Sequence, residues 1–157
     1  MVELDVKIEA GDLYDYMLMH SYTGASGLLG SCIGALAVIV GVLRGPHLLW
    51  IFGIILLVYL PWTLFLKSRQ QVMNEAFQKP LHYVLDETGI TVSQGEVSEH
   101  QDWAAMVKAV STSRSIIVYT SRTGASIFPR KQLGEKETAV IQTICANMDA
   151  KKVKIRN

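Results

Sequence analysis

LLWIFGIILLVYLPWTLFL, at residues 48–66, is an apolar stretch of 19 residues without a charged side chain, and it decides the fold. A second uncharged stretch of 22 residues precedes it at 22–43. About 20 apolar residues in a helix cross the roughly 30 Å hydrocarbon layer of a membrane. The link at 44–47, RGPH, contains a Gly-Pro turn signal and is too short for anything but antiparallel neighbours. We therefore predict a transmembrane hairpin within residues 21–66, with spans at 22–43 and 48–66.

Composition supports this interpretation. Hydrophobic residues make up 50% of the 157 residues and charged residues only 18%. The alternative, two helices buried in a soluble core, conflicts with a chain too short to surround them. The net charge of +1 gives no indication of nucleic-acid binding. The first twenty residues lack the pattern of a cleavable signal peptide.

Flanking cations indicate the orientation of the hairpin. Lys7 precedes the first span, and Lys67, Arg69 and Lys79 follow the second, whereas the link contains only Arg44. Cytoplasmic flanks of membrane helices carry the excess of lysine and arginine. We expect a multi-pass protein with both termini in the cytoplasm.

The first span has a face of small residues. Small side chains let helices approach closely in lipid. The small side chains of the first span either pack against the second span or form the interface of a homodimer. Neither span contains Asp, Glu, Lys, Arg or His, which is atypical of a transporter or channel. The members of this candidate helix-packing face are Ser26, Gly30, Gly34, Ala37 and Gly41.

The remaining segments predict a small domain of strands and one helix. Residues 1–20 show a period-two alternation at 2–8, then a short helix capped by Asp12 that reaches about His20. We expect this strand to join the sheet after the membrane. Residues 67–80 predict a polar extension of the second span, ending at Pro80. Within 81–150, strand-like runs occur at 82–85, 90–93, 97–103, 115–120 and 125–128, followed by a helix from Gly134 to about Met148. Residues 151–157 form a basic tail.

Three motifs resemble those of a known family: YVLDETGI at 83–90, WAAMVKAV at 103–110 and IFPRK at 127–131. In order and spacing they are similar to the YcxB-like C-terminal domain of bacterial membrane proteins. The family's layout, with two membrane helices ahead of this domain, is also matched. The resemblance implies a pleckstrin-homology-like (PH-like) bent antiparallel sheet closed by a C-terminal helix. It also implies the bacterial cytoplasmic (inner) membrane, and it brings no activity or cofactor. The predicted fold class is thus membrane α+β.

Few residues are candidates for a catalytic, metal or ligand site. The four histidines have no metal-ligand spacing, and His100, within Glu99–Asp102, is interpreted as part of a surface polar cluster. Cys32 and Cys145 are far apart in the sequence. We expect no catalytic, cofactor or metal site. The basic residues are either contacts to lipid or to a protein partner, or solvated charges. Arg122, Arg130 and Lys131 would cluster if the last hairpin brings its ends together. These candidate contacts are Arg122, Arg130, Lys131, Lys151, Lys152, Lys154 and Arg156.

Two functions fit these observations. The first is a non-catalytic, membrane-anchored binding or adaptor module whose PH-like domain docks a protein segment or lipid headgroups. The alternative is an accessory or structural subunit that assembles through its membrane helices, with a second copy or with another membrane protein.

Overall fold

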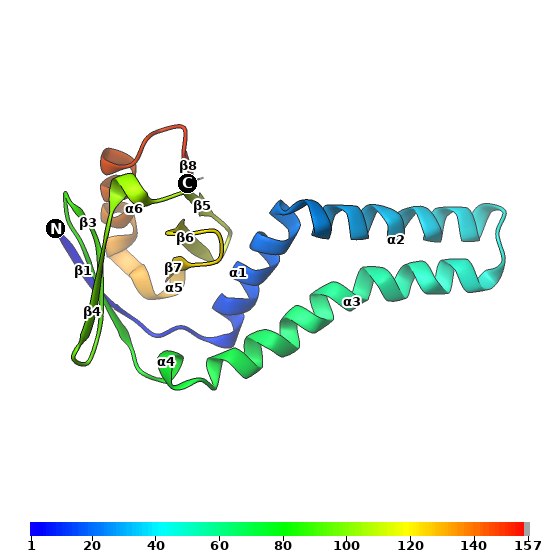
Figure 1. Ribbon diagram of the computed structural model, residues 1–157, viewed down its shortest axis with the longest axis horizontal. Helices are drawn as coiled ribbons and strands as arrows, with labels where there is room; N and C mark the ends of the chain where they lie inside the picture. Colours follow the sequence, from blue (N-terminus) through cyan, green and yellow to red (C-terminus); the bar gives the residue numbers. More distant parts are fainter. Residues whose placement is uncertain (156–157) are drawn as a thin grey trace.

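The computed structural model describes residues 1–155, the side chain of Ser26 excepted. It is a mixed α+β structure in which a long helical hairpin projects from a compact, strand-rich domain (Figure 1). The amino-terminal strand and everything after the hairpin belong to the domain. The hairpin is therefore an insertion between two parts of the domain, and both of its ends meet the domain on the same side.

Three helices build the hairpin and its base. Helix α1 (Ala10–Thr23) lies against the domain, α2 (Ala25–Leu43) leads outward, and α3 (His47–Val72) returns. The chain bends by 78° between α1 and α2, so the first apolar helix begins at Ala25 rather than at residue 22. Pro61 lies inside α3 without ending it. Of the described helices, α3 is by itself long and apolar enough to be a candidate membrane span, and α2 becomes a second candidate if it and α1 count as one bent span.

Two local predictions need correction. Asp12 does not start its helix: it lies in the first turn of α1, where its carboxylate accepts the backbone N–H of Glu9 at 3.0 Å. The polar extension after the second span is not one helix, because α3 ends at Val72 and the short helix α4 (Glu75–Gln78) follows. The Asn74 side chain accepts the N–H of Ala76 at 3.4 Å and starts α4 anew.

The first sheet joins the strand before the hairpin to the strands that follow it. Its order is β1-β2-β3-β4, antiparallel throughout, and Val2 of β1 pairs with Leu85 of β2. The alternation at residues 2–8 places Leu4, Val6 and Ile8 in the core. The four strands are β1 (Val2–Val6), β2 (Leu81–Leu85), β3 (Gly89–Gln94) and β4 (Val97–Asp102).

The second sheet has the order β7-β6-β5-β8, and a 3-10 turn at Trp103–Ala105 leads into it. Its first three strands are antiparallel, and β8 adds to β5 in parallel. Strand β8 lies in the predicted basic tail at 151–157, so part of that tail belongs to the second sheet. The four strands are β5 (Lys108–Ser111), β6 (Ser115–Tyr119), β7 (Ala125–Pro129) and β8 (Val153–Lys154).

The core lies between the sheets and the last helices. The ring centroids of Tyr83 on β2 and Phe128 on β7 are 4.9 Å apart, which joins the two sheets directly. Helix α6 (Glu137–Asn147) adds Val140 and Ile144, both fully buried. The short helix α5 (Arg130–Leu133) and a 3-10 turn (Gly134–Lys136) lead into α6. The strands thus form two sheets where the sequence predicts one bent sheet, and a carboxyl-terminal helix does pack on them.

Candidate functional site: a basic cleft at the base of the hairpin

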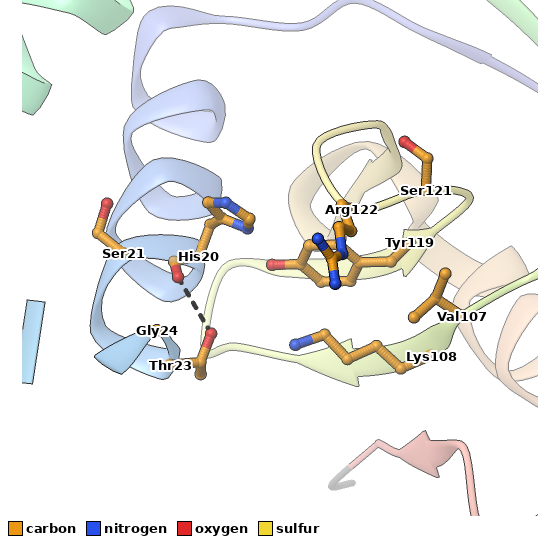
Figure 2. Close-up of a pocket in the computed structure, with 9 residues that line it drawn as sticks. All are labelled: His20, Ser21, Thr23, Gly24, Val107, Lys108, Tyr119, Ser121 and Arg122. Atoms are coloured by element: carbon orange, nitrogen blue, oxygen red, sulfur yellow. Dashed lines mark hydrogen bonds between the residues drawn. The ribbon is translucent and has the colours of Figure 1, made fainter. Parts of the chain in front are cut away.

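A cleft opens where α1 meets α2 beside the second sheet. It comprises a smaller cavity of about 390 Å³ and a larger one of about 810 Å³. Thr23, Val107 and Lys108 line both cavities, so the two lie side by side. The end of α1 closes one side: the Thr23 hydroxyl donates to the carbonyls of Met19 and His20 at 2.7 and 3.2 Å (Figure 2). We call this combined space the basic cleft.

Cations from separate parts of the chain meet in the basic cleft. Lys108 lies between the two cavities, Arg122 borders the smaller one, and Lys151, Lys152 and Lys154 border the larger. Among the described residues that line the two cavities, none is acidic. Clefts lined by one sign of charge concentrate ligands of the opposite sign. The basic cleft is therefore suited to an anion.

Strand register explains the position of Lys108. It pairs with Tyr119 across β5 and β6, so both side chains lie on the same face of the sheet. The Lys108 ammonium lies 4.5 Å from the centroid of the Tyr119 ring, a cation–π contact (Figure 2). This contact holds one cation in the middle of the cleft.

Tyr119 forms the back of the smaller cavity. Its side chain is 2% exposed and stacks with His20, with ring centroids 6.0 Å apart. Tyr16 lies beside both rings, and its hydroxyl donates to the carbonyl of Thr123 at 2.8 Å. The Tyr119 hydroxyl is buried and has no hydrogen-bond partner within the described part of the chain. Burial, and to a smaller extent Tyr16, raises the pKa of Tyr119 to about 12. At neutral pH this phenol is therefore an uncharged donor.

The predicted basic residues divide into two groups. Arg130 is paired with Glu137, and the Lys131 ammonium lies 2.5 Å from the carboxylate of Glu9. Both lie at the far end of β7 from Arg122, so the predicted cluster of these three residues does not form. The Lys131 contact lowers the pKa of Glu9 through its hydrogen bond and its charge.

The tail residues approach the cleft instead. Lys151, Lys152 and Lys154 line the larger cavity, and the Lys152 ammonium also donates to the carbonyl of Met106 at 3.0 Å. Arg156 lies outside the described residues. Sequence reasoning missed Lys108, His20 and Tyr119, because no local motif shows that α1 and β6 lie side by side.

The small-residue face of α2 packs mainly within the hairpin. A Cβ atom added at Gly34 would lie 2.9 Å from Leu57, and one at Gly41 would lie 2.5 Å from the backbone of Trp50, so both glycines contact α3. Ala37 is half-buried. A Cβ atom at Gly30 would meet no described atom within 4 Å. The side chain of Ser26 lies outside the described part of the chain.

The histidines and cysteines form no second site in the described residues. His100 hydrogen-bonds the Thr91 hydroxyl at 2.8 Å and lies 3.4 Å from the Asp102 carboxylate on the exposed strand β4. Cys32 and Cys145 are free and exposed. No group of three His, Cys, Asp or Glu side chains is arranged to bind a metal within residues 1–155.

The fold and the cleft define a class of protein: a two-sheet α+β domain that carries a helical hairpin and an anion-attracting cleft at its base. Residues 85–144 match the family model described as YcxB-like protein, which confirms the resemblance found in the sequence. The match runs from the last residue of β2 into α6 and contains Lys108, Tyr119 and Arg122; α1, the hairpin and the tail lie outside it. No curated protein and no solved structure matches the chain.

Proposed function

We propose that this protein is a non-catalytic, membrane-anchored binding module. Helix α2 and the apolar part of α3 span the cytoplasmic membrane of a bacterium as a hairpin. The PH-like domain lies at the cytoplasmic face, where the basic cleft binds an anionic ligand. The observation that carries the proposal is the position of the cleft, directly at the base of an exposed apolar hairpin.

The dimensions and exposure of the hairpin support its place in a membrane. At 1.5 Å per residue, the 19 residues of α2 are about 28 Å long, close to the roughly 30 Å of a hydrocarbon layer. The most apolar window of α3 has a mean hydropathy of 2.2, and only 6% of it is buried inside the protein. The core helix of a soluble protein would be mostly buried. Lipid is the environment in which these exposed side chains are stable.

The two native cysteines test this topology. Cys32 lies in the middle of α2, and Cys145 lies on α6 in the domain. With a membrane-impermeant maleimide, Cys145 should react in inverted vesicles but not in intact spheroplasts. Cys32 should react only after detergent is added. Arg44→Cys in a chain without the native cysteines is the matched control, and it should react in spheroplasts.

The opposite labelling pattern would count against the proposal. If Cys32 reacts as fast as Cys145 in vesicles without detergent, the hairpin does not span. If Cys145 reacts in spheroplasts, the domain is on the outer side and the cytoplasmic placement is wrong.

Binding in the cleft is tested by site-specific photo-crosslinking in native membranes. Val107 lines both cavities and is 47% exposed, so a photoreactive residue there should capture the ligand. Val97, 73% exposed on β4 of the other sheet, is the control position. Equal adducts at both positions, or none at position 107, would argue against a binding cleft.

The alternative, an accessory subunit that assembles through its membrane helices, rests on Gly30. This glycine is the member of the small-residue face whose surroundings are open, whereas Gly34 and Gly41 already contact α3. Self-association that depends on Gly30 would favour this function.

A further inference from the structure

We infer that the ligand of the basic cleft is an anionic phospholipid of the same membrane, with its phosphate held by Tyr119, Lys108 and Arg122. This inference rests on the proposed function and names its ligand class. It assigns the smaller cavity to the phosphate and the larger one to the first part of the acyl chains.

The Tyr119 hydroxyl is a buried donor that lacks an acceptor. A buried hydroxyl without a hydrogen bond lowers stability, and native structures rarely keep one without a reason. In Figure 2 this hydroxyl points toward the end of α1, into the space lined by His20 and Thr23. A phosphate oxygen at this position would accept the hydrogen bond. Since burial raises the pKa of the phenol, the group stays protonated and able to donate.

Two cations flank that donor. Lys108 lies against the Tyr119 ring, and Arg122, on the turn between β6 and β7, lines the same cavity (Figure 2). Arg122 is exposed, so its side chain can swing aside for an entering headgroup and then close on the phosphate. Guanidinium and ammonium groups are the usual partners of phosphate oxygens. The three groups therefore supply donors from both sides of one cavity.

The larger cavity distinguishes a lipid from a soluble anion. Besides its lysines, it is lined by Met19, Tyr22 and Leu28. Leu28 is 54% exposed on the first turns of α2, where that helix enters the proposed hydrocarbon layer. One side of the larger cavity, formed by Met19, Tyr22 and Leu28, is thus apolar and leads toward the proposed membrane, while the lysines line the rest of this cavity. An acidic peptide or a free phosphate would have no use for this apolar side, whereas the acyl chains of a phospholipid would pack against it.

Native mass spectrometry of the delipidated full-length protein in neutral detergent tests the inference. The probes are dioleoyl phosphatidylglycerol and dioleoyl phosphatidylcholine, which share acyl chains and differ in charge. The wild-type protein should retain phosphatidylglycerol preferentially. Tyr119→Phe and Lys108→Gln should each weaken that binding about tenfold, as expected for a lost hydrogen bond to a charged group. Lys136→Gln, an equal loss of charge on the exposed turn before α6, should change it less than twofold.

Thermal unfolding of the same variants separates binding from structure. Because its hydroxyl has no partner within the described residues, Tyr119→Phe should unfold at the wild-type temperature or above it. A variant that binds less lipid without losing stability supports a binding role. Loss of lipid together with a lowered unfolding temperature would overturn it.

Other outcomes also overturn the inference. Equal retention of both lipids would exclude recognition of charge. Displacement of phosphatidylglycerol by an equal concentration of glycerol phosphate would assign the site to a soluble phosphate. An adduct from position 107 that contains protein instead of lipid would leave the proposed binding module standing while refuting its lipid ligand.

Discussion

The two hairpin helices approach each other closely at Gly53, and its substitution by alanine tests their packing. A Cβ atom at this position would lie 2.7 Å from the carbonyl oxygen of Gly34 and 2.8 Å from the backbone nitrogen of Val38. Both are backbone atoms of α2, which cannot move aside as a side chain can. Ordinary van der Waals contact begins at 3.4 Å, so the helices must separate by about 0.7 Å.

The expected cost follows from two opposing effects. Overpacking of a tight contact costs about 1–3 kcal/mol. Replacement of glycine by alanine inside a helix returns up to about 1 kcal/mol. We therefore expect Gly53→Ala to lower the free energy of unfolding by up to about 2 kcal/mol. Gly30→Ala is the matched control, because its added Cβ atom meets no described atom within 4 Å and only the propensity gain remains.

The assay is reversible unfolding of the full chain in mixed micelles by titration with sodium dodecyl sulfate, followed by tryptophan fluorescence. Trp50 and Trp62 both lie on α3 and report on its surroundings. Sedimentation of the same samples gives the oligomeric state. Unfolding of Gly53→Ala at the wild-type midpoint, together with loss of a dimer in Gly30→Ala, would refute the reasoning. The small-residue face would then be a seam between two copies.

Three further predictions concern the domain, each checked by unfolding of the full chain in detergent. Phe128→Ala removes a fully buried ring and should cost about 3–5 kcal/mol, measured with urea. Asp12→Ala removes the acceptor for the N–H of Glu9 and should cost about 1 kcal/mol, measured in the same way. The hydrogen bond from the Thr88 hydroxyl, with the backbone N–H groups of Thr88 and Gly89, lowers the pKa of Asp86 below its unfolded value. The stabilisation that the ionised Asp86 carboxylate contributes is therefore complete above its unfolded-state pKa and is lost as the pH falls through its folded-state pKa. The difference in unfolding temperature between wild type and Asp86→Asn should shrink on acidification. A difference that stays constant with pH would contradict this prediction.

Much of the secondary structure is predictable because its signals are local. The alternation at residues 2–8 and the apolar run at 48–66 correspond to β1 and to most of α3. The bend at Gly24 and the break at Met73 were not foreseen. At the base of the hairpin α1 packs against α3, where Tyr14 meets the ring of Phe65 edge-on with centroids 5.8 Å apart, and no local pattern in the sequence shows this contact.

The candidate site could be predicted only in part. Arg122 and the tail lysines were singled out for their charge, and they do line the basic cleft. The conditional grouping of Arg122 with Arg130 and Lys131 does not form, because the five residues of β7 separate Arg122 from the other two. No charge pattern indicated Tyr119, whose part in the cleft follows from burial and register.

Length, hydropathy and periodicity are properties of neighbouring residues, so the sequence by itself determined an apolar helical hairpin, a strand-rich domain and its YcxB-like motifs. Only the tertiary structure decided that the strands divide into two sheets and that the tail adds β8 to one of them. It alone brought α1, β5, β6 and the tail together around the cleft. Such contacts join residues about a hundred positions apart, as Tyr16 and Thr123 are. Their formation depends on burial and on the cost of closing long loops, which no local pattern records.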